Sequence, residues 1–390
     1  MQHEYGKRGE SMRRTTLVLI IFLLVVGLVV GLTRLVRSQP SVELHVAVHP
    51  VMLDWVSDAV ATFNATNPLL GTQPMRFVVE SVEDIDVWLD GGAAARDWTI
   101  ESHPVVWIPA WSTSVNYASR QPYQIIQSSL ARTPLVWGGF QSRVAALTAD
   151  GDAFDWARVA SAAEQGNWSA INPSTGFSNN NLTLAFNRPT QTTSGMAVLL
   201  SGAAAFSDTF DLVGDDLTLA DYRQWITPVL ESVPNYNTLG SSPAQSLATR
   251  GASLGEMALL PEADWLRNLR GRLSNADDPL VLSYPAYPFV FDFPMTLWSG
   301  ALPNGVTYTS EQVRTAVGRL ASALMSPSGQ LTAQSYGLRP ALGAVDPASP
   351  LFAAGVAYGA QIDADLFTYV RAPALNDMQR LLTWTGGIIR

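Results

Sequence analysis

The stretch VELHVAVHPVMLDWVSDAVATFN, residues 42–64, decides the fold class. Its first seven residues alternate apolar with other side chains, which is the pattern of a β-strand, and the His-Pro pair at 49–50 ends that strand. The apolar residues of 52–64 recur at helical spacing and share one face, so we predict a helix there. A strand followed directly by a helix is typical of an α/β fold.

Apolar runs continue this alternation along the chain. We predict further strands at 75–80, 104–109, 133–138, 182–186, 256–260 and 280–284, and helices at 82–95, 196–206, 219–233 and 310–325. Strands that alternate with helices indicate βαβ units and a largely parallel sheet, in which ligands bind at the carboxyl ends of the strands. The simplest arrangement is two α/β lobes, with the second inserted into the first.

Before the first strand lies TTLVLIIFLLVVGLVVGLT, residues 15–33, which carries no charge and is long enough to cross a hydrocarbon core of about 30 Å as a helix. Basic residues at 7, 8, 13 and 14 predict a cytoplasmic N-terminus. No small-x-small cleavage site follows, so we predict an uncleaved anchor over 15–36, with a tail at 1–14 and a linker at 37–41. A buried core helix is the alternative, but such helices are rarely apolar on every face.

The composition limits the partners of the chain. It has no cysteine, so it can be neither a lipoprotein nor stabilised by disulfides. The formal net charge is −9, and several of the basic residues lie beside the predicted anchor, so the remainder of the chain is more acidic still. Such a charge argues against nucleic acid and against an anionic membrane surface as partners.

A family resemblance emerges from the order of six segments. These are PVVWIPAWST, TPLVW, NRPTQTTSG, GEMALLPEADWL, LVLSYPAYPFVFDFPM and YGLRPA. Together they resemble bacterial extracellular solute-binding proteins of the type II periplasmic fold, and more narrowly the substrate-binding-like domains sometimes found with von Willebrand factor A domains. The resemblance spans residues 42–384. The chain departs from the family pattern in its uncleaved anchor and in lacking the DxSxS loop of a von Willebrand module.

The resemblance implies a two-lobed α/β fold in which two hinge strands join the lobes. Residues 42–138 and 283–390 would form the first lobe, and residues 139–282 the second. The lobes would close on a small solute that binds between them.

The best candidate for ligand contact is the predicted helix start at Thr192, Thr193 and Ser194. Free N–H groups at a helix start and the positive end of the helix dipole attract anionic or strongly polar groups, and the hydroxyls add donors. An ordinary N-cap is the alternative, because Ser and Thr favour that position in any helix.

Further candidates follow a strand or lie in the second lobe. Trp111, Ser112 and Thr113 would face the cleft with an aromatic wall and hydroxyls, or else form a solvated loop whose Trp packs on the core. Ser241 and Ser242 could donate from the second lobe, or form a plain turn before Pro243.

His49 and Tyr284 complete the candidates. His49 ends the first strand, at a position that often meets ligand in proteins of the resembled fold, and a capping or surface histidine is the alternative. Tyr284 lies near the returning hinge, where a tyrosine belongs more often to the core than to a ligand wall.

The sequence GASLG, residues 251–255, matches the G-x-S-x-G elbow of α/β-hydrolases. In those enzymes the serine follows a strand and its histidine comes later in the chain, whereas all four histidines precede Ser253. No Walker loop, HExxH or Cys/His cluster occurs, so we predict no enzyme, cofactor or metal site. Asp84, Asp86 and Asp90 fail the EF-hand pattern and are expected on an exposed helix face.

These observations lead to one expectation and one alternative. We expect a membrane-anchored, extracytoplasmic protein that closes on a small polar or anionic solute, for transport or sensing. Its partner would be an ABC-type permease or a signalling protein in the same membrane. The alternative is a cell-envelope scaffold that keeps the fold without a ligand.

Overall fold

The computed structural model describes residues 21, 22, 24–26, 41–89, 95–149, 151, 153–177, 179–240, 242–269 and 277–389. The predicted anchor, tail and linker therefore lie almost entirely outside the described residues. Those of the anchor that are described, 21, 22 and 24–26, are helical and exposed. Within the described part of the chain, no helix is both long and apolar enough to cross a membrane.

The first sheet has six strands in the order β2-β3-β1-β4-β10-β5 over the described residues. Their bounds are β1 Val42–Val48, β2 Leu69–Leu70, β3 Gln73–Ser81, β4 Val106–Ile108, β5 Tyr123–Gln127 and β10 Met295–Trp298. Strand β1 lies between β3 and β4 and is parallel to both, so the carboxyl ends of these strands meet at one edge. Strand β10 returns late in the chain and runs antiparallel between β4 and β5.

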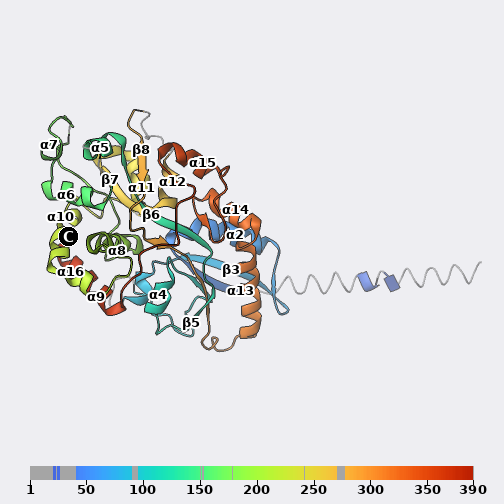
Figure 1. Cartoon of the computed structure of the whole chain (residues 1–390). Helices are drawn as coiled ribbons and strands as arrows, with labels where there is room; N and C mark the ends of the chain where they lie inside the picture. Colours follow the sequence, from blue (N-terminus) through green and yellow to red (C-terminus); the bar gives the residue numbers. More distant parts are fainter. Residues whose placement is uncertain are drawn as a thin grey trace, which may run out of the picture.

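Two long helices pack beside this sheet. In α2 (Leu53–Ala65), Trp55, Val56 and Val60 are buried, as the helical spacing predicts. Helix α13 (Ser310–Leu324) begins with a capping box in which the Thr309 and Gln312 side chains each accept from the other residue's backbone N–H. It packs against α2, and Figure 1 shows it along the side of the sheet.

The second sheet is built around β6 (Ala131–Phe140). The first half of β6 pairs with β9 (Val290–Phe291) and β11 (Arg339–Pro340). Its second half pairs with β7 (Met257–Pro261) and β8 (Leu280–Ser283). Strand β6 therefore connects the part of the molecule that contains the first sheet with the helices that surround β7 and β8.

The remaining helices surround the two sheets (Figure 1). Their bounds are α3 Ile85–Trp88, α4 Ser112–Tyr117, α5 Gln141–Leu147, α6 Trp156–Gln165, α7 Trp168–Ile171, α8 Thr193–Ser207, α9 Gly214–Thr218, α10 Ala220–Glu231, α11 Pro243–Arg250, α12 Glu262–Asn268, α14 Pro327–Ser335, α15 Pro350–Gly355 and α16 Leu375–Ile388. Every residue of α8 from Thr193 to Ala204 is buried, because α6, α9, α10 and β7 pack around it. We call α6, α8, α9 and α10 the second group of helices.

The end of the chain returns to the second group of helices. Helix α16 packs against α9 and α10, and Figure 1 shows the C-terminus beside them. The division of the chain into lobes at 138/139 and 282/283 stays a prediction, and it did not include this return.

Most of the predicted elements are confirmed, and two are not. The prediction of a largely parallel sheet is also wrong, because among the strands of the described residues only β1 forms parallel pairs, with β3 and β4. The strand at 42–48 and the helix at 310–325 match β1 and α13 to within one residue. The helix at 82–95 is wrong, because in its described part only α3 is helical: the Val82 N–H still bonds to Val48 O beside the sheet. The strand at 182–186 is also wrong, because only Leu184 forms a bridge, with Met257.

Candidate ligand-binding site

The carboxyl ends of the parallel strands meet the start of α8 through one side chain, Glu83, two residues after the end of β3. Its Oε2 accepts a hydrogen bond from the backbone N–H of Thr193, at 3.0 Å. The same oxygen lies 3.4 Å from Nε2 of His49, which follows β1. This distance is long for a hydrogen bond, so His49 faces Glu83 mainly as a charge. We call these three residues the Glu83 contact.

Burial and charge act in opposite directions on the two side chains of the Glu83 contact. Burial alone would raise the pKa of Glu83, but the neighbouring His49 and the hydrogen bond from the Thr193 N–H outweigh it and lower that pKa. Burial alone would lower the pKa of His49, but the attraction of Glu83 outweighs it and raises that pKa. Both shifts favour the charged forms of the two side chains.

Asp84 is fully buried, and the expectation of an exposed helix face is wrong for it. Its two carboxylate oxygens accept from the backbone N–H of Ala110, at 3.0 and 2.9 Å, and one also accepts from the Ser114 hydroxyl at 2.6 Å. Burial raises the pKa of Asp84 to about 6. Asp84 therefore ties the end of β3 to the segment that follows β4. Asp90 lies outside the described residues.

Trp111, Ser112 and Thr113 lie at the start of α4, as expected for residues that follow a strand. The Trp111 side chain is buried, and its ring centroid lies 4.9 Å from that of Phe289. The Ser112 N–H donates to Asp292 at 2.8 Å, and burial raises the pKa of this aspartate to about 6. The geometry of Trp111 thus agrees with the alternative in which it packs on the core.

The start of α8 is an ordinary N-cap in geometry. The Thr192 hydroxyl oxygen accepts from the Gly195 N–H at 3.0 Å. A Cβ on Gly195 would lie 2.3 Å from the carbonyl oxygen of Asn187, so only glycine lets the preceding loop lie against the helix. Thr193 and Ser194 are buried. The free end of the helix is directed at Glu83 through the Thr193 N–H.

The other candidates lie elsewhere. Ser241 is outside the described residues. Ser242 caps α11, where its hydroxyl accepts from the Gln245 N–H at 3.4 Å. Tyr284 hydrogen-bonds to Glu262, which also pairs with Arg339. The structure therefore brings His49 and Thr193 together, while Tyr284 belongs to a separate buried network.

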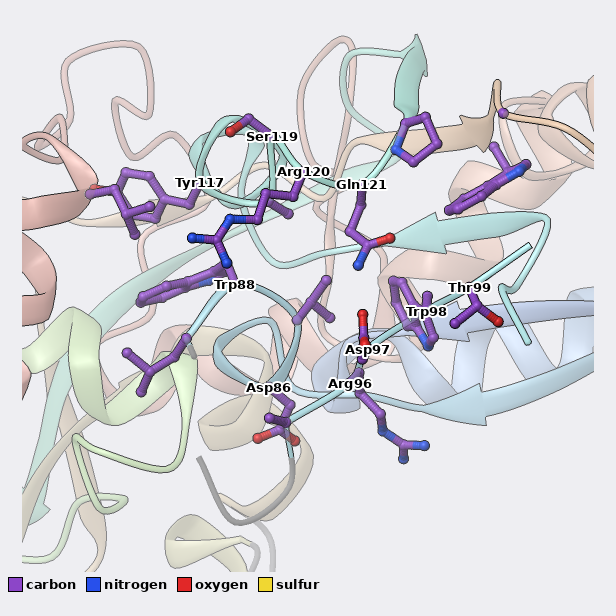
Figure 2. Close-up of a pocket in the computed structure, with 18 of the residues that line it drawn as sticks. Asp86, Trp88, Arg96, Asp97, Trp98, Thr99, Tyr117, Ser119, Arg120 and Gln121 are labelled. Carbon is purple, nitrogen blue, oxygen red and sulfur yellow. The ribbon is translucent and has the colours of Figure 1, made fainter. Parts of the chain in front are cut away.

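A cavity of about 1090 Å³ opens beside this region, between α3, α4 and the start of α16. Carboxylates at Asp86 and Asp97, the guanidinium of Arg120 and the amides of Gln121 and Gln379 supply its polar lining. The aromatic residues Trp88, Trp98, Tyr117 and Trp298 supply apolar walls. Figure 2 shows Asp97 and Gln121 reaching toward each other from opposite sides of the cavity. We call this the α3–α4–α16 cavity.

Burial raises the pKa of two lining groups, Asp86 and Tyr117. Burial, together with the nearby charge of Glu83, raises the pKa of Asp86 to about 6, although Arg96 acts against the shift. The Tyr117 hydroxyl donates to the carbonyl oxygen of Pro373, just before α16. Residues 86–122 and residues 375–379, which are far apart in the sequence, therefore meet at this cavity.

Sequence reasoning missed Glu83, Asp292 and the α3–α4–α16 cavity. Glu83 could have been found, because it follows a predicted strand and such positions meet at one edge of a parallel sheet. The cavity had no signal in the sequence, because its lining residues come from separate segments such as 95–101, 117–122 and 375–379.

The hydrolase motif does not form a nucleophile elbow. Gly251–Ser253 form a short 3₁₀ turn that follows helix α11 and not a strand. The Ser253 hydroxyl donates to the carbonyl oxygen of Arg250 at 3.0 Å. No cluster of His, Asp or Glu among the described residues could hold a metal ion.

Comparison with known proteins identifies the fold. No family model matches the chain, and no curated protein sequence is similar to it. The maltose-bound MalE3 of T. maritima is similar in structure, with a TM-score of 0.55 and 11% identity over 89% of this chain and 94% of that one. AfuA of Actinobacillus pleuropneumoniae, with bound fructose-6-phosphate, has a TM-score of 0.55 and 12% identity over 90% and 99%.

A third solved structure, a chitin oligosaccharide binding protein, has a TM-score of 0.53 and 14% identity over 88% of this chain and 95% of that one. Identities this low show the fold alone. The chain has the α/β fold of periplasmic solute-binding proteins, and the resemblance in its sequence is confirmed at that level.

Proposed function

We propose that this chain is an extracytoplasmic solute-binding protein, held at the membrane by residues 15–36, whose two lobes close on a small polar solute of the carbohydrate class. The observation that carries the proposal is the position of the α3–α4–α16 cavity. Helices α3 and α4 follow strands of the first sheet, whereas α16 packs on α9 and α10. A solute in the cavity would therefore contact both groups of elements, and binding would shift the population toward the closed form.

The chemistry of the lining supports a carbohydrate. Ligand cavities commonly measure roughly 300 to 1000 Å³, so this one could hold more than one sugar ring. Asp97, Gln121 and Gln379 offer planar acceptors and donors for hydroxyl groups, and the aromatic walls can pack on the apolar faces of sugar rings. The charged lining residues are three acids and two bases, which favours a polar solute without large net charge; they are Asp86, Arg96, Asp97, Glu101 and Arg120. Two of the similar structures are named for maltose and for chitin oligosaccharide.

Anchoring would restrict the role of such a protein. A tether of a few residues keeps the binding domain beside one membrane, so its partner would be a permease of the ABC type or a signalling protein in that membrane. His49 and Thr193 would take part in closure, and Trp111, Ser112 and Thr113 would support the wall that faces the cavity.

Thermal unfolding of the full chain in lipid nanodiscs tests this proposal. Nanodiscs are needed because maltoside detergents carry sugar head groups. Maltose, chitobiose, raffinose and ribitol should be screened, and at least one should raise the unfolding temperature in a concentration-dependent way. Glutamate, inorganic phosphate and calcium serve as solutes of other classes.

Two substitutions make the test specific to the cavity. Asp97→Ala should weaken binding of the stabilising sugar by about tenfold or more, the effect of losing roughly 1.4 kcal/mol of binding free energy. Glu231→Ala, at an exposed position at the end of α10, is the control and should leave the affinity unchanged. If no carbohydrate stabilises the chain, the cell-envelope scaffold without a ligand becomes the better account.

A further inference from the structure

We propose that the point occupied by Oε2 of Glu83 is an oxyanion site, which the chain fills with its own carboxylate and which a solute carboxylate or phosphate binds by replacing Glu83. In the self-filled state this carboxylate holds α8 against the edge of the first sheet. The inference goes beyond the carbohydrate proposal, because it concerns a different position and holds whichever solute the α3–α4–α16 cavity takes.

Two groups, the Thr193 N–H and the His49 ring, converge on this oxygen. The Thr193 N–H donates to it from the first residue of α8, a helix of 15 residues whose dipole adds partial positive charge at this end. His49 Nε2 lies 3.4 Å away. A helix start that supplies a backbone donor, with a histidine ring beside it, provides the surroundings that an oxyanion requires.

Two buried polar atoms at the site have no hydrogen-bond partner among the described residues. These are Nε2 of His49, a residue that is 1% exposed, and Oγ1 of Thr193, a residue that is 0% exposed. Buried polar atoms are normally paired, because an unpaired one costs about 1–3 kcal/mol. Glu83 thus uses only part of the bonding capacity of the site, and an anion with more oxygens could use the rest.

The charges around the site favour an anion that replaces the Glu83 carboxylate over an anion that binds beside it. Asp84 and Asp86 lie close to Glu83 in the chain, and Asp264 also faces His49. A second anion beside Glu83 would be repelled by all of these carboxylates. When a solute oxyanion replaces Glu83, however, the charge at the site changes little. We therefore expect competition between solute and side chain.

Glu83 can leave the site without disturbing the backbone. The N–H of Val82 bonds to Val48 O at 2.9 Å, and the Asp84 carboxylate holds Ala110, so both neighbours of Glu83 are fixed. The Glu83 side chain itself is 20% exposed, so it is not completely enclosed by the protein. The Glu83 side chain can therefore change its conformation and leave its position to a bound anion.

Chemical rescue tests the proposal with the full chain in nanodiscs. Glu83→Ala should unfold at a lower temperature than wild type. Acetate or inorganic phosphate should raise this unfolding temperature toward the wild-type value, in samples that sodium chloride keeps at constant ionic strength. Wild type should need about tenfold more of either anion for the same stabilisation, because its own carboxylate competes. Glu80→Ala, which removes a carboxylate from β3 nearby, is the matched control and should behave as wild type does.

A second substitution shows whether the site lies where we place it. His49→Ala combined with Glu83→Ala should lose the response to both anions. Equal stabilisation of wild type, Glu83→Ala and Glu80→Ala by acetate would overturn the proposal, and so would an unchanged response in the double variant.

The absence of cysteine from the chain allows a direct measurement of the holding contact. Thr315→Cys on α13 and Ser161→Cys on α6 place one spin label beside each sheet at exposed positions. Glu83→Ala should lengthen or broaden the distance between the labels, and acetate should reverse the change. If Glu83→Ala does not fold, Glu83→Gln takes its place; because it keeps an acceptor for the Thr193 N–H, it should broaden the distance less, and acetate should not reverse the change. A distance identical to wild type in the folded variant would overturn the holding role.

Discussion

Glu83 and Glu262 each join segments that are far apart in the chain, yet the surrounding structure holds them differently. Glu262 is completely buried and accepts from Nε and Nη2 of Arg339, at 2.6 and 2.7 Å, and from the Tyr284 hydroxyl. Glu83 is 20% exposed and has one backbone donor at 3.0 Å and a histidine nitrogen at 3.4 Å. One carboxylate is fully bonded, and the other is not.

This difference separates a structural contact from one that can exchange. A buried ion pair with its hydrogen bonds complete is costly to break, because the partner left behind keeps an uncompensated charge. Arg339 also donates to the carbonyl oxygen of Ile362 at 2.9 Å, which fixes it further. Glu83 is partly exposed, and although its loss leaves His49 buried, histidine can release its proton whereas Arg339 cannot. We infer that Glu262 maintains the fold, whereas the Glu83 carboxylate can be replaced by a bound anion.

The largest effect is expected at the buried pair. Glu262→Ala should lower the free energy of unfolding by about 3–5 kcal/mol, because Arg339 would remain charged and buried. Urea unfolding, followed by tryptophan fluorescence, measures the change. The control is Asp211→Asn in the exposed pair with Arg371, whose side chains are 68% and 72% exposed. That change should cost about 1 kcal/mol or less.

If Glu262→Ala were no more costly than Asp211→Asn, the contrast between the two carboxylates would not hold. Arg339→Met is a second variant at the same pair. It should cost less than Glu262→Ala if Tyr284 continues to donate to the carboxylate that remains.

A smaller effect is expected at Asp84, which positions Glu83. Asp84→Ala should cost about 1–3 kcal/mol, because the N–H of Ala110 would be buried without its acceptor. Asp84→Asn keeps an acceptor oxygen and should cost less. The same unfolding measurement compares the two. Equal losses in both variants would mean that the charge of Asp84, and not its hydrogen bonds, stabilises this edge.

Local sequence pattern was enough to predict much of the fold. The alternation over residues 42–48 and the amphipathic run from 310 identified β1 and α13, because burial on one face is encoded at fixed spacing. The helix predicted at 82–95 was too long, because Asp84 bonds to Ala110, 26 residues away, and interrupts the regular pattern ahead of the short α3. Such a tertiary bond leaves no periodic signal.

The candidate site was predictable only in its separate parts. His49 and Thr193 were chosen from a strand end and a helix start, which are both local signals. That a single glutamate joins them could not be seen, because Glu83 and Thr193 are 110 residues apart. The α3–α4–α16 cavity depends on the return of α16 to the second group of helices, which no repeat or motif indicates.

The pH dependence of stability offers a further test of the buried acids around the site. Burial raises the pKa of Asp84 and Asp292 to about 6. The folded chain then binds more protons than the unfolded chain between about pH 4 and 6, so its stability should fall as pH rises through this range. The raised pKa of His49 extends the fall above pH 6.5, whereas the lowered pKa of Glu83 acts in the opposite sense below pH 4.5.

Asp292→Asn isolates one of these groups. It should reduce the slope of unfolding free energy against pH by at most about 1.4 kcal/mol per pH unit, the effect of one proton. The free energies of unfolding of wild type and Asp292→Asn, measured from pH 4 to 8, give the two slopes. A wild-type stability that rises between pH 4 and 6 would contradict the assignment of these raised pKa values.

The smallest effect on stability is expected at Glu83 itself. Glu83→Gln keeps a side-chain oxygen that can accept from the Thr193 N–H, and it loses only the attraction of His49 across 3.4 Å. Because the side chain is partly exposed, we expect a loss of about 1 kcal/mol or less in urea unfolding. Glu262→Gln is the matched comparison and should cost more, because an amide cannot accept both donors of Arg339 and the Tyr284 hydroxyl. Equal losses would place Glu83 among the structural contacts and would leave no exchangeable position at the start of α8.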